Sequence, residues 1–162
     1  MQLERHPTPN YSEGRGREVP RAIIVHTNHG SFVGTVSWFG REGSGVSAHY
    51  LVGLDGRVAL FVDEGDTAQH AGKEESESRA VFGRTDANRS AIGIEFEDAG
   101  KPDSSPRSER QYEAGGRLIR EVAHRWNIPL DSAHIVGHRD VRQGTDCPGN
   151  LDVERLIREA TE

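Results

Sequence analysis

The sequence predicts a single-domain α/β fold in which helices flank a mixed central β-sheet. Short apolar runs rich in β-branched residues alternate with segments of helical periodicity. The dipeptide Asp55-Gly56 lies between two apolar runs and predicts a tight hairpin, hence at least one antiparallel pair of strands. The length of 162 residues is close to the usual size of one domain and leaves little room for a second.

Five segments have the patterns of strands. AIIV is a short apolar run and predicts a buried strand. The two segments beside Asp55-Gly56 form the hairpin, and the runs SAIGIEFE and HIVGH complete the set. In chain order, the predicted strands cover residues 21–27, 46–54, 57–62, 90–97 and 134–138.

Two helices are predicted in the second half of the chain. Residues 108–126 carry apolar side chains three and four positions apart, with Ser108 at the start and Pro129 beyond the end. A shorter helix over residues 151–160 begins near Asp152, whose negative charge is favourable at a helix N-terminus.

Composition argues against several classes of function. The formal net charge is -6 and the basic residues are scattered, which disfavours binding to a nucleic-acid backbone. No segment approaches the length and apolarity of a membrane span, and residues 1–20 lack the features of an export signal. We therefore divide the chain into an N-terminal extension, residues 1–20, and a functional domain, residues 21–162. We expect a monomer that is made in the cytoplasm and does not insert into a membrane.

The only cysteine, Cys147, lies nine positions after His138, and His26 ends the apolar run AIIVH far upstream. Two imidazoles and one thiolate leave the fourth tetrahedral position of a zinc ion open for water, as in catalytic rather than structural sites. The alternative is that all three are ordinary core residues. The sequence favours the metal site over this alternative, because Cys147 precedes the turn signal Pro148-Gly149 and both histidines lie at the ends of predicted strands.

Five phrases, in this order and spacing, carry a resemblance to a known family: IIVHTN, VSAHYLVGLDGRV, QHAG, SAIGIEFED, and HIVGHRDV followed by TDCPG. The chain resembles the zinc-dependent N-acetylmuramoyl-L-alanine amidases of type 2, a group that includes phage lysozyme-type amidases and the peptidoglycan recognition proteins. The resemblance covers nearly the whole chain. It implies the fold of that group, with residues 21–162 as the amidase catalytic domain.

The resemblance also implies an activity and a partner. The reaction is hydrolysis of the amide between N-acetylmuramic acid and the L-alanine that begins the stem peptide of peptidoglycan, with one Zn²⁺ per chain held by His26, His138 and Cys147. Three settings stay open: a phage endolysin that passes a holin-type pore, a cytoplasmic muropeptide-recycling amidase, and the catalytic half of a longer autolysin. We expect the endolysin, because no export signal is visible and the chain is a bare catalytic domain.

The rival class is a non-catalytic peptidoglycan-binding or regulatory module of the same fold. Retention of all three ligands together with Glu95 favours the enzyme. Glu95, in the IGIE motif, matches the catalytic glutamate of many type 2 amidases and is expected to shuttle the proton that the leaving nitrogen needs. Glu97 stays open for that role, because strand alternation puts it on the same face.

Departures from the family pattern identify further candidates. Thr145 stands where many members with an aspartate ligand carry a lysine, and its hydroxyl is expected to hydrogen-bond the developing oxyanion. Ala48 replaces the tyrosine of the phage lysozyme-type members, so a tyrosine proton donor is absent there. Asp146 competes as a metal ligand, but Cys147 directly precedes Pro-Gly and matches the family, and a thiolate suits zinc.

The other histidines divide by context. His70, in AQHAG, matches a motif that lines the amidase groove, although Gln69 replaces the usual tryptophan. We expect His70 and Asn28 to contact substrate, His49 to orient a ligand from behind, and His29 to lie at the groove rim. The remaining histidines are expected to be surface or internally satisfied residues: His6, His124 and His134.

Three further expectations concern segments without a clear period. Trp38 is expected to anchor a short helix in the core, with sugar stacking as the lesser alternative. Residues 72–89 are polar with both charge signs and are expected to form a groove wall rather than a plain solvated loop. Residues 98–108 are rich in Pro, Ser and Gly and read as a connector.

Overall fold

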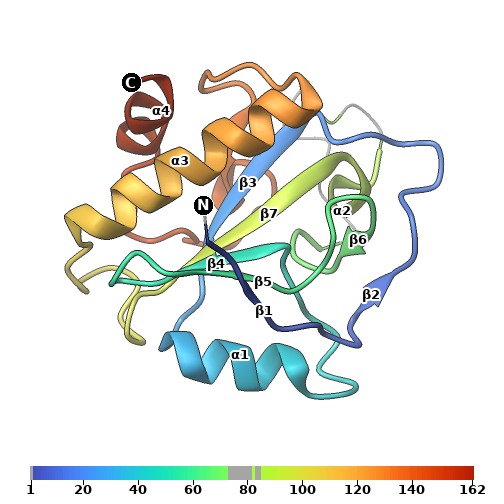
Figure 1. The fold of residues 1–162 in the computed structure, drawn as a ribbon, viewed down its shortest axis with the longest axis horizontal. Coiled ribbons are helices and arrows are strands. Elements are labelled where there is room, and N and C mark those ends of the chain that lie inside the picture. The colour runs from blue at the N-terminus through green and yellow to red at the C-terminus, as the bar shows by residue number, and fades with distance from the viewer. Residues whose placement is uncertain (1, 73–81, 83–84) are drawn as a thin grey trace.

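A six-stranded mixed sheet forms the centre of the computed structural model, which describes residues 2–72, 82 and 85–162 (Figure 1). The strand order is β1-β5-β4-β7-β3-β8, and all neighbours are parallel except β4 and β5. The strands are β1 (Glu4–Arg5), β3 (Ala22–Thr27), β4 (Tyr50–Val52), β5 (Val58–Leu60), β7 (Ala91–Phe96) and β8 (Ile135–Gly137). The predicted α/β class with a mixed sheet is confirmed.

The hairpin signal is confirmed in its register. Tyr50 pairs with Leu60 and Val52 pairs with Val58, on either side of the turn that contains Gly56. Gly56 has φ 85°, a left-handed conformation that favours glycine. The two strands are shorter than predicted, because only three residues of each form ladder pairs. A second, two-stranded antiparallel sheet joins β2 (Tyr11–Ser12) to β6 (Thr67–Ala68).

Both predicted helices form, with boundaries within two residues of those expected. Helix α3 (Glu109–Trp126) begins after Ser108, whose hydroxyl accepts a hydrogen bond from the Gln111 N–H, and ends at Asn127 in the left-handed conformation. Helix α4 (Val153–Thr161) has Asp152 as its N-cap. Among the described residues, two α-helices precede them in the chain, α1 (Phe32–Gly40) and the single turn α2 (Ala87–Ser90).

The two faces of the sheet are covered differently. Helices α3 and α4 pack against one face and enclose the largest apolar cluster of the described residues, including Ile23, Ile94 and Leu118. On the opposite face, α1 packs over β4 and β5 through Phe32 and Phe39. Figure 1 shows α3 and α4 on one side of the strands and α1 on the other. The second face is left open at the ends of β3 and β7, where the site lies.

The segment that we set apart as an N-terminal extension is built into the same fold. Strand β1 pairs with β5 at the edge of the main sheet, and β2 pairs with β6. Arg15 is buried and donates to the carbonyl oxygens of Glu64 (2.7 Å) and Ala91 (3.1 Å). Residues 4–15 therefore contribute to the structure of the domain.

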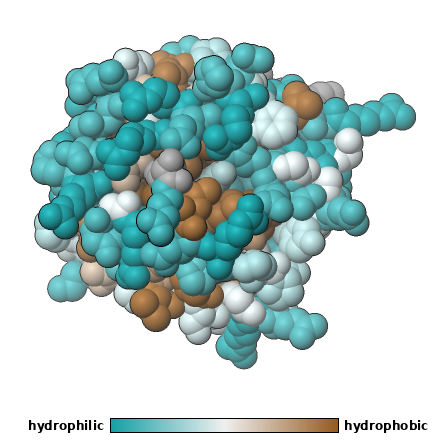
Figure 2. Space-filling model, in the orientation of Figure 1, coloured by the Kyte–Doolittle hydropathy of each residue, from teal (hydrophilic) through white to brown (hydrophobic). Residues whose placement is uncertain are grey.

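One expectation about the core is wrong. Trp38 is 48% exposed, whereas its neighbour Phe39 is buried and anchors α1 together with Phe32. The sequence pattern of this helix did not show which of the two adjacent aromatic residues faces inward. Figure 2 shows that the face drawn in Figure 1 is largely hydrophilic, with hydrophobic residues confined to a few small areas. Within the described residues, no helix is both long and apolar enough to cross a membrane.

Candidate metal and catalytic site

Two neighbouring parallel strands bring the first two functional side chains together. His26 on β3 pairs in register with Glu95 on β7, so both side chains leave the same face of the sheet near the carboxyl ends of the strands. Helices α3 and α4 cover the other face through the alternate residues Val25 and Ile94. The strand alternation thus separates an apolar face from a functional one.

Two further potential metal ligands, His138 and Cys147, lie beside His26. Ligand atoms of His26, His138 and Cys147 all lie within 4.8 Å of one another. The Cys147 sulfur is 3.7 Å from Nδ1 of His26, and the two imidazole rings are 4.5 Å apart between centroids. Tetrahedral zinc, with bonds of about 2.0–2.3 Å to nitrogen and sulfur, holds its ligand atoms about 3.5 Å apart. The three residues therefore fit a single zinc ion.

The segment that carries Cys147 is held in place by backbone contacts. The Thr27 N–H points at the sulfur at 3.3 Å, and the Cys147 carbonyl accepts a hydrogen bond of 2.7 Å from the Arg139 N–H. The Cys147 N–H in turn donates to the Thr145 hydroxyl at 3.2 Å. Asp146, the competing ligand, is exposed and is absent from the cluster of potential ligands found in the described residues.

Burial sets the protonation of the ligands. It lowers the pKa of His26 well below its usual value, an effect that the nearby His138 reinforces, and it also lowers the pKa of His138. Neutral imidazole is the form that binds a metal. Burial, with help from Glu95, raises the pKa of Cys147 to about 12. A cation is therefore needed to stabilise the thiolate, and its binding releases a proton.

Glu95 has the surroundings of a proton-transfer group. Its Oε2 is shielded from solvent and has no hydrogen-bond partner among the described residues, although the residue lines the cavity. Burial first, and the nearby Asp98 carboxylate second, raise the pKa of Glu95 to about 8. A carboxyl group with such a pKa exchanges its proton near neutral pH.

Glu97, the open alternative, is occupied elsewhere. Its carboxylate accepts hydrogen bonds from the backbone N–H groups of Phe32 (2.9 Å) and Leu54 (2.8 Å). These bonds tie the start of α1 and the β4–β5 turn to the end of β7. Glu97 is absent from the residues that line the cavity, so the geometry favours Glu95 for proton transfer.

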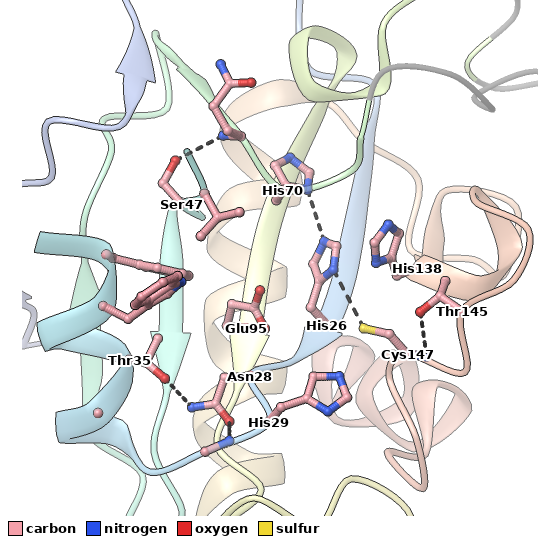
Figure 3. A pocket seen from close by; sticks show the side chains of 16 residues that line it. His26, Asn28, His29, Thr35, Ser47, His70, Glu95, His138, Thr145 and Cys147 are labelled. Carbon is pink, nitrogen blue, oxygen red and sulfur yellow. Dashed lines mark hydrogen bonds between the residues drawn. The ribbon is translucent and has the colours of Figure 1, made fainter. Parts of the chain in front are cut away.

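The cluster opens into a cavity of about 510 Å³. One end holds the metal ligands with Glu95 and Thr145, and the other is formed by α1 and residues 46–47 (Figure 3). Trp38 on α1 lines this second end, with its ring beneath the Arg41 guanidinium at 5.7 Å. The cavity thus joins a polar reaction site to an apolar wall.

Asn28 lies on the cavity wall below Glu95 in Figure 3. Its amide nitrogen donates to the Thr35 hydroxyl at 2.6 Å, and its oxygen accepts from the N–H of Gly30 (3.1 Å) and Asp98 (3.2 Å). These contacts orient the side chain and link α1 to the strand ends. A contact between Asn28 and substrate stays a prediction.

The imidazole of His70 faces the candidate metal ligand His26. Its Nδ1 lies 3.0 Å from Nε2 of His26, whereas its own Nε2 is shielded from solvent and lacks a partner among the described residues. The ring packs over Gly93, where an added Cβ would lie only 2.5 Å from it. His70 lines the cavity, and a contact between His70 and substrate stays a prediction.

His70 lies between His49 and the candidate metal ligand His26, whereas we expected His49 to orient a ligand itself. Its Nδ1 accepts from the Gly93 N–H at 3.0 Å, and its Nε2 lies 3.2 Å from the Asp66 carbonyl and 2.6 Å from the Arg15 guanidinium. Burial and Arg15 lower the pKa of His49 to about 3, so the ring is neutral. It packs against His70, with 5.7 Å between ring centroids, and supports a ligand only through that ring.

The other expectations are met in part. His29 lines the cavity, as predicted for the rim, and has a left-handed backbone with φ 54°. His134 contacts Asp131 and His6 contacts Glu4, whereas His124 is exposed. Most of the predicted groove wall, residues 72–89, lies outside the described residues.

Sequence reasoning missed two buried polar residues behind the site. Arg15 lies in a polar segment with no recognisable pattern, and the four backbone carbonyl oxygens that accept its hydrogen bonds come from distant parts of the chain. Asn88 lies in the stretch that we read as a groove wall, yet it is 2% exposed. The only available signal was its place just before the SAIGIE strand, where an asparagine commonly caps a turn.

Three candidate metal ligands and a carboxyl group of raised pKa lie together at the carboxyl ends of parallel strands in an α/β domain, an arrangement that would suit metal-assisted hydrolysis. The sequence matches the N-acetylmuramoyl-L-alanine amidase family over residues 15–150. The chain belongs to that family, and the family assignment made from the sequence motifs is confirmed.

Two individual relatives are amidases of the same family. N-acetylmuramoyl-L-alanine amidase A of Achromobacter lyticus is 32% identical over 125 residues, which cover 76% of this chain and 62% of the relative. The 1,6-anhydro-N-acetylmuramyl-L-alanine amidase AmpD of Haemophilus influenzae is 32% identical over 114 residues, 69% of this chain and 57% of that protein. The chain thus spans about three fifths of the length of these relatives.

Solved structures show the same fold. The crystal structure of a selenomethionine derivative of AmpD superposes with a TM-score of 0.79 at 23% identity and covers 98% of this chain and 99% of that one. The amidase LysC from Clostridium intestinale gives a TM-score of 0.70 at 21% identity and covers 99% of this chain and 98% of its own. The peptidoglycan-amidase fold predicted from the motifs is confirmed.

Proposed function

We propose that the protein is a zinc-dependent amidase that hydrolyses the bond between N-acetylmuramic acid and the L-alanine of the stem peptide in peptidoglycan. The observation that carries the proposal is a Glu95 carboxyl oxygen that has no hydrogen-bond partner among the described residues and lies beside the cluster of His26, His138 and Cys147 in one cavity. Membership of the amidase family supports the choice of bond. Retention of all these groups argues against a module that only binds peptidoglycan.

Each residue has a distinct part in the proposed reaction. When bound, zinc supplies Lewis acidity to this site, for the carbonyl of the amide and for water. Glu95, with its pKa raised to about 8, accepts a proton from water and passes one to the leaving nitrogen. The Thr145 oxygen accepts from the Cys147 N–H, which leaves its own O–H proton free to donate to the developing oxyanion.

Product analysis tests the bond that is cut. Digestion of purified peptidoglycan should release stem peptides that begin with L-alanine from intact glycan strands, detected by mass spectrometry and amine labelling. Glycosidases of the usual kind need two carboxylates that flank the sugar linkage, whereas here one candidate carboxylate lies beside a metal cluster. New reducing ends, or peptides cut within the stem, would contradict the proposal.

Metal analysis tests the ligands. Purified protein should contain one zinc ion per chain, and chelation should abolish activity that added zinc restores. Exchange of Cys147 for Asp, an alternative zinc ligand, should retain more zinc than exchange for Ser. Equal occupancy in the two variants would point to Asp146 as the ligand instead.

The biological setting is a separate part of the proposal. We infer an endolysin that acts on the cell wall as a monomer after release through a holin-type pore, supported by the endolysin folds among the structural neighbours. The similarity to AmpD supports a second candidate, an amidase of soluble muropeptides in the cytoplasm. The two differ in substrate size. A higher rate on intact wall sacculi than on soluble 1,6-anhydro muropeptides would support the endolysin, and the reverse would support recycling.

A further inference from the structure

The two ligand histidines direct their outer ring nitrogens at successive residues of one segment. Nε2 of His26 lies 3.0 Å from Nδ1 of His70, and Nε2 of His138 lies 3.3 Å from the carbonyl oxygen of Ala71. Histidines that bind a metal usually donate their other ring N–H to such a partner, which fixes the tautomer and the ring plane. Residues 70 and 71 therefore support both imidazoles at once.

The direction of these bonds follows from the ligand cluster. Nδ1 of His26 is the nitrogen that faces the Cys147 sulfur, at 3.7 Å, so Nε2 carries the hydrogen and donates to His70. The Ala71 carbonyl can only accept, so Nε2 of His138 is also the donor, and its Nδ1 is left for the ion. Both rings thus use the same nitrogen toward the metal.

Asn88 holds this segment through its whole side-chain amide. Its oxygen accepts from the backbone N–H groups of His70 (2.8 Å) and Ala71 (2.7 Å), and its nitrogen donates to the Gly72 carbonyl (3.2 Å). The hydrogen bonds of this side chain go to neither His26, His138 nor Cys147 but to both residues that face the two imidazoles. A buried amide with three satisfied bonds defines the backbone position closely.

Asn88 is itself fixed from two sides. Its backbone N–H donates to the Asp86 side chain at 2.9 Å at the start of α2, and its carbonyl accepts from the buried guanidinium of Arg15 at 3.3 Å. Behind His70, the missing side chain of Gly93 lets the ring rest on the strand. The support runs without a gap from the N-terminal segment to the metal ligands.

We propose that Asn88 is a positioning residue of the metal site, which sets the orientation of His26 and His138 by holding the backbone at residues 70–72. The inference rests on the zinc site of the proposed function. It adds a determinant of metal affinity that lies outside the ligands and the substrate cavity.

The test measures zinc affinity of the full chain by competition with a chromophoric chelator, and the absorption spectrum of the Co²⁺-loaded protein. Asn88→Leu removes all three hydrogen bonds at similar volume and should weaken zinc binding about 10- to 100-fold, with an altered Co²⁺ spectrum. Asn88→Asp keeps the acceptor for His70 and Ala71 and loses only the bond to Gly72. It should recover most of the affinity.

Gln111 provides the matched control. It is equally buried, and its amide nitrogen donates to the carbonyls of Val52 (3.1 Å) and Glu97 (2.9 Å) beneath α3. Gln111→Leu should lower the free energy of unfolding and leave the zinc affinity of the folded protein unchanged. Equal affinity of wild type, Asn88→Leu and Gln111→Leu would overturn the inference, and so would equal losses in the last two.

A second pair of variants covers the case in which Asn88→Leu does not fold. His70→Asn keeps an acceptor near the position of Nδ1, whereas His70→Leu removes it. The leucine variant should bind zinc at least tenfold more weakly than the asparagine variant. Equal affinity in this pair would overturn the inference. If wild-type protein bound no zinc, the proposed metal site itself would fail, and the two failures are therefore distinguishable.

Discussion

The two faces of β3 and β7 are built from the same strands and serve opposite purposes. On the face toward α3, Ile23 and Val25 lie beside Ile92 and Ile94 in a closed apolar cluster. On the other face, the strand ends expose a histidine and a glutamate to a cavity. From Val25 to His26 on β3, and from Ile94 to Glu95 on β7, successive residues change from the apolar cluster to the lining of the cavity.

The difference shows how stability and chemistry are kept apart. The closed face uses residues whose burial is favourable by itself, at about 25 cal/mol for each Å² of apolar surface. The open face holds groups whose burial is costly unless a partner or an ion compensates it. Perturbations of the two faces should therefore separate stability from activity, and the following predictions test that separation in order of decreasing effect.

The largest effect is expected at Glu95. Glu95→Gln preserves volume and removes the proton-transferring group, so turnover should fall by about a hundredfold or more while zinc content stays near one per chain. Glu97→Gln is the control, because its carboxylate holds two backbone N–H groups outside the cavity. It should lower stability and leave turnover of the folded protein largely intact. A reversed outcome would move the proton transfer to Glu97.

The closed face should respond in stability alone. Leu118 is 1% exposed in the cluster beneath α3. Leu118→Ala should reduce the free energy of unfolding by about 2–5 kcal/mol, measured by urea denaturation, because it removes buried contacts and leaves a cavity. Val33→Ala on the exposed side of α1 should change stability by less than about 0.5 kcal/mol. Loss of zinc affinity in folded Leu118→Ala protein would show that the faces are coupled.

Acid should destabilise the open face through its buried neutral histidines. The pKa of His49 is lowered from 6.5 to about 3, so folding favours the uncharged ring. Its contribution is complete above pH 6.5 and is lost as the pH falls toward 3, because the unfolded chain binds the proton more readily. His49→Gln should therefore lose less stability than wild type between pH 6.5 and 4, measured by denaturation with chelator present. Parallel curves would contradict the assigned pKa.

The smallest effect is expected at Thr145. Thr145→Ala removes a hydroxyl that accepts from the Cys147 N–H and lines the cavity, so turnover should fall by about tenfold or somewhat more. Thr145→Ser should restore most of the rate, since it keeps the hydroxyl. A loss in the serine variant as large as in the alanine variant would show that the methyl group matters instead.

Local pattern was sufficient for the framework of the molecule. Short apolar runs predicted β3 and β7, the Asp55-Gly56 signal predicted the hairpin, and apolar spacing with Ser108 predicted α3, because these features depend on a residue and its near neighbours. The motifs also pointed to the three candidate metal ligands that the structure brings together, since their spacing is shared with a family.

Only the tertiary structure decided between residues close together in the sequence and showed which residues support the site. Whether Trp38 or Phe39 faces the core depends on how α1 packs over β4 and β5. Glu95 rather than Glu97 is left for chemistry because Glu97 binds the start of α1 and the β4–β5 turn. Asn88 reaches the metal ligands only through residues that are distant from them in the chain. Burial and hydrogen bonding of this kind are properties of the folded arrangement, because the partners come together only when the chain is packed.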